Sequence, residues 1–186
     1  MNIHVKRRVH NQSILQLGFR TQAARNFPDM ELHIHPSRNL HSTIVSEKYH
    51  HYTPINMLDM ANIIRQEPEH TSESLVANVK AVQVFGRSLK DNRLSVGLAL
   101  ENNEHLNADR QYYVRALGHH AQGEYRHHVT LIGVDNPTDE AVDRLLAWTA
   151  ERAPTTVRLG RISVGLSSLL DSDTEVTLSA SEKRIA

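Results

Sequence analysis

The residues of this chain most suited to chemistry are two copies of one short histidine–threonine pattern. Residues 41–44 read HSTI and residues 128–131 read HVTL, so each copy places a threonine two positions after a histidine and an aliphatic residue directly after the threonine. Both copies lie in stretches with the alternation of a β-strand, in which side chains i and i+2 project from the same face. Each histidine is therefore expected to share a face with its own threonine, while the residue between them faces the other way.

Two imidazoles and two hydroxyls would suit the cleavage of a phosphodiester if the two strands were neighbours in one sheet. Displacement at phosphorus needs a base for the attacking oxygen, an acid for the leaving oxygen, and hydrogen-bond donors for the nonbridging oxygens. Because the pKa of an unperturbed histidine is about 6.5, one imidazole can be neutral and the other charged near neutral pH. We predict that His41 and His128 form the acid–base pair, in an order that the sequence leaves open, and that Thr43 and Thr130 bind the phosphate.

The alternative for either motif alone is that it has no function. A histidine–x–threonine triplet on a strand arises often by chance, and a histidine on a strand is more often packed or exposed than catalytic. Repetition of the whole pattern in opposite halves of the chain favours the catalytic interpretation.

The chain contains 13 histidines, so a metal site also has to be weighed. His33 and His35 form an H-x-H pair, and histidine doublets occur at 50–51 and 119–120. The sequence has no HExxH motif and no cysteine, and no acidic residue at helical spacing from these histidines would complete a ligand set. A serine-nucleophile elbow and a P-loop motif are absent as well. We therefore predict no metal and no cofactor.

Local patterns predict the elements that must position the two motifs. Alternation predicts strands at residues 13–19, 39–46, 79–85, 93–100 and 127–134, and β-rich stretches at 156–166 and 174–178. Helices are predicted at 21–27, at 53–66, at 103–117 with Gly118 closing the helix, and at 138–152 with Thr138 as cap. The basic residues 6–8 are interpreted as a charged N-terminal stretch. The sequence thus predicts one α+β domain over residues 1–186, with residues 180–186 as a loose tail.

Composition limits the partners. Basic and acidic residues number 21 each and aromatic residues make up 5%, so the chain lacks the basic stripe expected for a long nucleic-acid track. A small cyclic nucleotide or a short oligonucleotide is the expected partner. No run reaches membrane-spanning length and no cleavable leader is recognisable, which favours a cytoplasmic protein, in the host cytoplasm if phage-encoded. The oligomeric state is left open.

Several residues near the motifs are further candidates for ligand contacts. Tyr125 and Arg126 directly precede the second motif, and Lys48 and Tyr49 follow the first. Basic side chains could contact a phosphate and aromatic rings could stack on a base, as Phe85 at the end of its predicted strand could. The alternatives are solvated loop positions for the polar residues and core packing for Phe85.

Paired H-x-T-aliphatic motifs in an α+β domain of this length resemble the 2H phosphoesterase superfamily. The resemblance implies a bilobal domain, two sheet-and-helix halves around a central cleft, with His41 and His128 as the acid–base pair and Thr43 and Thr130 holding the phosphate. The superfamily includes cyclic phosphodiesterases that act on 2′,3′-cyclic phosphates, RNA 2′,5′-ligase-like proteins, and phage enzymes that degrade cyclic oligonucleotide messengers of bacterial immunity.

A longer stretch of sequence resembles the last of these groups, the phage anti-CBASS enzymes. The segments LHSTIVSEKYHHY and VFGRSLKDNRLSVGLAL, with a helix and then EYRHHVTL, are similar to its two motif regions. The segment between Tyr52 and Leu75 is longer than expected for that group. The resemblance implies a degrader of cyclic oligonucleotides, with an RNA-processing 2′,3′-cyclic phosphodiesterase and a non-catalytic RNA- or nucleotide-binding module as the alternatives.

Overall fold

A strand-rich architecture follows from the many short alternating segments of the chain. The computed structural model describes residues 2–10, 19–35, 40–48, 62, 63, 66, 74–87, 92–117, 125–167 and 175–179. Its elements are, in order, β1 (Asn2–Val9), α1 (Phe19–Asn26), β2 (Leu32–Ile34), β3 (His41–Lys48), β4 (Leu75–Arg87), β5 (Arg93–Leu100), α3 (Glu104–Ala116), β6 (His128–Asp135), α4 (Asp139–Ala150), β7 (Thr156–Ser167) and β8 (Glu175–Ser179).

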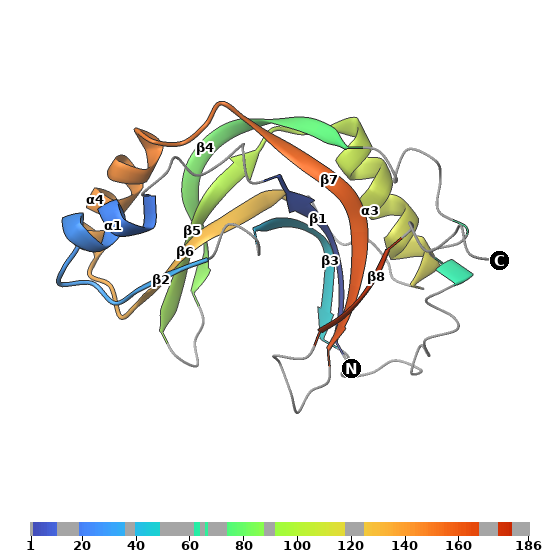
Figure 1. The fold of residues 1–186 in the computed structure, drawn as a ribbon, viewed down its shortest axis with the longest axis horizontal. Helices are drawn as coiled ribbons and strands as arrows, with labels where there is room; N and C mark the ends of the chain where they lie inside the picture. Colours follow the sequence, from blue (N-terminus) through green and yellow to red (C-terminus); the bar gives the residue numbers. More distant parts are fainter. Residues whose placement is uncertain are drawn as a thin grey trace.

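Six of these strands form a closed antiparallel ring. The strands follow the order β1-β3-β6-β5-β4-β7, and β7 pairs back with β1, while β2 adds to β6 and β8 adds to β7. The sheet curves into an arch with the helices on its outside, α1 and α4 beside each other at one end and α3 at the other (Figure 1). The α+β prediction is confirmed, whereas the division into two halves around a central cleft stays a prediction.

Most of the elements predicted from local patterns are present. The strand predictions at 39–46, 79–85, 93–100, 127–134, 156–166 and 174–178 correspond to β3, β4, β5, β6, β7 and β8, and the helix predictions at 21–27, 103–117 and 138–152 to α1, α3 and α4. Thr138 caps α4 as predicted, since its hydroxyl accepts a hydrogen bond from the backbone N–H of Ala141 at 3.3 Å. The strand predicted at 13–19 is wrong at Phe19, which begins α1. Its other residues, most of the helix predicted at 53–66, Gly118 and the tail at 180–186 lie outside the described residues.

The main element that the sequence prediction missed is β1. Residues 6–8, interpreted as a charged N-terminal stretch, lie inside this strand, which pairs with β3 on one edge and β7 on the other. Arg7 is fully buried, and its Nε donates to Oδ2 of Asp109 on α3 at 2.7 Å. Its Nη1 donates to the carbonyl oxygen of Gly160 on β7 at 2.8 Å. One guanidinium therefore joins β1, β7 and α3.

Aromatic packing fixes the other two helices against each other. Trp148 of α4 lies 5.1 Å from the ring centroid of Phe19 and 5.6 Å from that of Phe27, the second contact being edge-on. All three side chains belong to the buried apolar core. Among the described residues, no helix is long and apolar enough to cross a membrane.

We predict that Asp109→Asn will lower the free energy of unfolding by about 3–5 kcal/mol, because it leaves the buried Arg7 guanidinium without its carboxylate. Urea unfolding followed by circular dichroism measures the change. Asp143→Asn, at an exposed position of α4, is the control and should change stability by less than about 0.5 kcal/mol. Equal stability of the two variants would contradict a structural role for the buried pair.

Candidate active site

One pairing between β3 and β6 brings the two histidine–threonine motifs together. Ser42 lies opposite Val129 in antiparallel orientation. Neighbours of matched residues in such a pair face each other in reverse order, so each histidine lies opposite the threonine of the other strand. Opposite Cβ atoms are about 4.5–5.5 Å apart, and diagonal positions are about 7–8 Å apart. The two histidines therefore occupy one diagonal of a four-residue group and the two threonines the other.

Burial separates the two faces of these strands. Ser42 and Val129 are fully buried. The four motif residues that flank them are partly exposed: His41, Thr43, His128 and Thr130. The alternation predicted from the sequence therefore holds on both strands, and all four side chains project from the same, accessible face. Their catalytic and phosphate-binding roles stay predictions.

Strand β1 adds two basic residues to this face. Lys6 is paired with Thr43 and Arg8 with His41, and directly opposite residues project from the same side of a sheet. Lys6 is buried, whereas Arg8 is exposed. The sequence prediction missed both residues, although the alternation of apolar and basic residues in IHVKRRV indicated a strand. Their positive charge favours a negatively charged group at the four-residue site.

Strand β5 keeps the other side of the site open. Ala99 is paired with His128 and Gly97 with Thr130, so small residues flank the motif. A Cβ on Gly97 would overlap the carbonyl oxygen of Val129, because the register shifts just before Gly97 and the two strands approach closely. Only glycine tolerates this contact without moving the strand that carries the second motif.

The imidazole of His128 is held on two sides. The ring of Phe85 stacks on it with centroids 4.1 Å apart and planes inclined by 12°. A register shift between Val84 and Gly86, whose φ is 156°, displaces Phe85 from the regular ladder. Nδ1 of His128 lies 3.0 Å from the carbonyl oxygen of Arg126, and since a carbonyl only accepts, Nδ1 is the donor. Nε2 is therefore the nitrogen left to take or give a proton.

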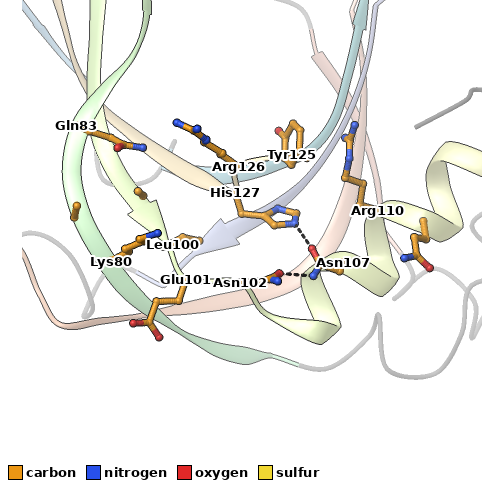
Figure 2. Close-up of a pocket in the computed structure, with 13 residues that line it drawn as sticks. Lys80, Gln83, Leu100, Glu101, Asn102, Asn107, Arg110, Tyr125, Arg126 and His127 are labelled. Carbon is orange, nitrogen blue, oxygen red and sulfur yellow. Dashed lines mark hydrogen bonds between the residues drawn. The ribbon is translucent and has the colours of Figure 1, made fainter. Parts of the chain in front are cut away.

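The neighbouring His127 has a different environment. Its side chain points away from Arg126 and toward Asn107, to whose Oδ1 its Nε2 donates at 3.3 Å (Figure 2). His127 is only 3% exposed. Burial, reinforced by the positive charges of Arg110 and His128, lowers the pKa of His127 to about 4. The ring is therefore neutral near pH 7 and is poorly suited to act as an acid, which distinguishes the two members of the doublet.

Tyr125 and Arg110 link the approach to β6 with β3. The hydroxyl of Tyr125 donates to the carbonyl oxygen of Thr43 at 2.8 Å, and the guanidinium of Arg110 lies 3.9 Å from the centroid of the Tyr125 ring. Burial raises the pKa of the Tyr125 hydroxyl, partly offset by Arg110. Nη1 of Arg110 also donates to the carbonyl oxygen of Ile44 at 2.8 Å. Arg110, which the sequence prediction missed, covers a ring that had been predicted to contact the ligand.

The other residues predicted to contact the ligand lie at different distances along the chain from the motif residues. Arg126 is exposed, two residues before His128. Lys48 ends β3 five residues beyond Thr43, which is about 16 Å along an extended strand. Its contact with a ligand stays a prediction. Tyr49 lies outside the described residues.

One group of side chains has the composition of a metal site. Ligand atoms of Glu31, His33 and Asp135 lie within 4.8 Å of one another. Arg93 already binds this carboxylate, since its Nε lies 2.7 Å from Oδ1 of Asp135. The hydrogen bonds from Arg93 and His33 lower the pKa of the Asp135 carboxyl to about 2. Asp135 is also seven residues from His128, about 23 Å along β6. A guanidinium in the group opposes a cation, so these residues do not make a metal centre for the motif histidines.

We predict that His127 makes folding sensitive to mild acid. The unfolded chain takes up a proton at His127 near pH 6.5, whereas the folded chain does so only near pH 4, so stability falls as the pH is lowered between these values. His127→Gln should remove that part of the dependence in urea titrations from pH 7 to pH 4. His105→Gln, at an exposed position of α3, is the control. An unchanged slope in His127→Gln would show that the imidazole is already charged in the folded chain.

Comparison of the whole chain with known protein families and with curated proteins gives no match. Solved structures do match. One, described as "Crystal structure of phosphoesterase", aligns with a TM-score of 0.50 and 12% sequence identity over 96% of this chain and 95% of its own. Another, described as "Structure of Kluyveromyces marxianus Usb1", aligns with a TM-score of 0.49 and 12% identity over 96% of this chain and 97% of its own. The chain is thus similar in fold, over nearly its full length, to a protein named as a phosphoesterase.

Proposed function

We propose that this protein is a metal-independent phosphodiesterase of the 2H type, which cleaves a nucleotide phosphodiester by acid–base catalysis between His41 and His128. The observation that carries the proposal is the pairing of Ser42 with Val129, which sets two imidazoles and two hydroxyls on one accessible face. The similarity in fold to a structure described as a phosphoesterase agrees with this reaction class.

The geometry suits an in-line displacement. The histidines lie on a diagonal of about 7–8 Å, which leaves room for a phosphorus atom with its entering and leaving oxygens between them. One neutral imidazole takes a proton from water as the water oxygen bonds to phosphorus. The other imidazole, which is protonated, gives its proton to the leaving oxygen as the P–O bond breaks. The products are a phosphomonoester and an alcohol. Thr43 and Thr130, on the other diagonal, donate to the nonbridging oxygens.

The orientation of His128 supports its part in this reaction. Stacking on Phe85 and the hydrogen bond from Nδ1 to the carbonyl oxygen of Arg126 fix both the ring plane and the tautomer. A held imidazole needs little reorganisation in the transition state, so proton transfer through Nε2 is favoured. Neither contact is needed for a histidine that is merely exposed on a strand.

For the substrate, we propose a cyclic oligonucleotide messenger, which would make the protein a phage-type suppressor of bacterial immunity acting in the host cytoplasm. The sequence resemblance to the anti-CBASS enzymes supports this choice, and the zero net charge of the chain agrees with a small ligand. The second candidate is a 2′,3′-cyclic phosphate at an RNA end. Both substrates present a phosphodiester to the same four side chains, so the substrate has to be decided by assay.

We predict that His41→Ala and His128→Ala will each lower kcat/KM by about 10²–10⁴-fold, the usual contribution of one acid–base group. Thr43→Val and Thr130→Val should lower it by about tenfold each, because each removes one hydrogen bond to the phosphate among several. Initial rates at several pH values should give a bell-shaped profile for the wild type, with one limb lost in each histidine variant.

The control for these variants is His105→Ala, which removes an exposed histidine outside the four-residue group. Circular dichroism should show the same fold for all five variants. Near wild-type rates in His41→Ala or His128→Ala would rule out the acid–base pair.

We predict turnover in excess EDTA, with cyclic di- and trinucleotides preferred over 2′,3′-cyclic mononucleotides. The ratio of kcat/KM values reports the difference in transition-state binding. A preference for the mononucleotides of more than about tenfold, or 1.4 kcal/mol, would favour RNA processing over immune evasion. Loss of activity in EDTA would contradict metal independence, and tight binding without turnover would favour a binding module.

A further inference from the structure

A cavity of about 530 Å³ lies beside the second motif. It is located where β5 ends and the chain enters β6, between these strands, β4 and the first turns of α3 (Figure 2). Its size is within the range of small-molecule sites in proteins. None of the four motif residues lines it, so it is a separate space next to the candidate active site.

Three cationic side chains from three different segments line this cavity: Lys80 of β4, Arg110 of α3, and Arg126 just before β6. Within the described part of the chain, none of them forms an ion pair with a carboxylate. The one acidic residue of the lining, Glu101, accepts a hydrogen bond from Asn78 at 2.9 Å and points away from Arg110 and Arg126 (Figure 2). The cavity therefore carries an excess of positive charge.

Arg110 is held in place before any ligand arrives. Its side chain is half-buried, donates to the carbonyl oxygen of Ile44, and lies over the ring of Tyr125. A guanidinium has five N–H donors, so these contacts leave others for a ligand in the cavity. Because Arg110 is already ordered in the folded protein, binding an anion costs little side-chain entropy and the binding free energy is more favourable.

The cavity and the motif residues are joined through short covalent and hydrogen-bonded paths. Arg126 is two residues from His128, a separation of roughly 7 Å along an extended strand. The carbonyl oxygen of Arg126 accepts the Nδ1 hydrogen bond of His128, and Tyr125 is bound to Thr43. A group held beside Arg126 in the cavity is thus close to a phosphate held at the motif residues.

We infer that this cavity is a subsite for the nucleotide backbone next to the phosphodiester being cleaved, and that Lys80, Arg110 and Arg126 each contact that backbone from a different side of the cavity (Figure 2). The inference rests on the proposed function and adds the residues that would produce its preference for an oligonucleotide with at least two phosphates over a mononucleotide. The lining offers three cationic and four amide side chains beside the apolar Ala81, Ala99 and Leu100, and Arg110 covers the face of Tyr125. For these reasons we assign the cavity to a phosphate rather than to a base stacked on Tyr125.

The test compares two substrates that share one scissile group. Adenosine 2′,3′-cyclic phosphate has one phosphate, and the dinucleotide ApA ending in a 2′,3′-cyclic phosphate has one more. In the wild type, kcat/KM should be at least tenfold higher for the dinucleotide. Arg110→Gln, Lys80→Gln and Arg126→Gln should each reduce this preference by threefold or more, mainly by raising KM for the dinucleotide. Lys80→Gln should leave the mononucleotide rate within about twofold.

Matched variants distinguish the loss of a positive charge from a loss of folding. Arg110→Lys keeps the charge and should retain part of the preference, and Arg115→Gln, at an exposed position of the same helix outside the cavity, should keep all of it. Lys80 and Arg126 are exposed, so their variants are expected to fold even if Arg110→Gln does not. An unchanged preference in the Lys80 and Arg126 variants would overturn the subsite.

A binding measurement tests the subsite independently of the proposed phosphodiesterase activity. The doubly phosphorylated dinucleotide pApA and adenosine monophosphate are titrated calorimetrically into the wild type and into Lys80→Gln/Arg126→Gln. The double variant should bind pApA at least tenfold more weakly and adenosine monophosphate nearly as before. This result without turnover would reject the phosphodiesterase and keep the subsite, and turnover with equal pApA affinity for both proteins would reject the subsite alone.

Discussion

The register between β3 and β6 is the constraint on which the candidate active site depends. These two strands share one ladder pair, Ser42 with Val129, and both residues are fully buried. A slip of one residue would turn a histidine and a threonine of one strand into the core and move buried side chains into solvent. The unfavourable burial of an imidazole without partners opposes that slip. The same alternation that buries Ser42 and Val129 therefore places the four polar side chains together.

Contacts on the buried side of the sheet hold this register in place. Arg7 joins β1, β7 and α3 through Asp109 and Gly160, and it is paired with Ser42 across the β1–β3 ladder. An ion pair without solvent contributes little net stability, because desolvation of both charges offsets their attraction, but it penalises any arrangement that separates them. Helix α3 thus has a defined position against the sheet. The same helix carries Arg110, which donates to the carbonyl oxygen of Ile44, the last residue of the first motif. Helix α3 thus supports both the core and the edge of the candidate site.

Local patterns were sufficient for most of the helices and strands and for the face on which the motif residues lie, because alternation and helix capping are properties of neighbouring residues. They were insufficient wherever partners are distant in sequence. Arg7 and Asp109 are 102 residues apart, and nothing near Arg7 indicates that its charge is buried and paired rather than solvated. For this reason β1 was interpreted as a charged stretch and Lys6 was overlooked. Arg110 was missed for the same reason, since its partners lie on β3 and before β6.

At the start of β6, side chains point alternately into the protein and toward the candidate active site. Tyr125 and His127 turn inward, where the hydroxyl of Tyr125 ties the segment to β3 and His127 stays neutral against α3. Arg126 and His128 turn outward, and the backbone between them supplies the carbonyl oxygen that fixes the tautomer of His128. A histidine doublet in sequence therefore corresponds to two different environments, one low in dielectric and one open to a substrate. Sequence composition counts the two imidazoles equally, and only the strand geometry distinguishes them.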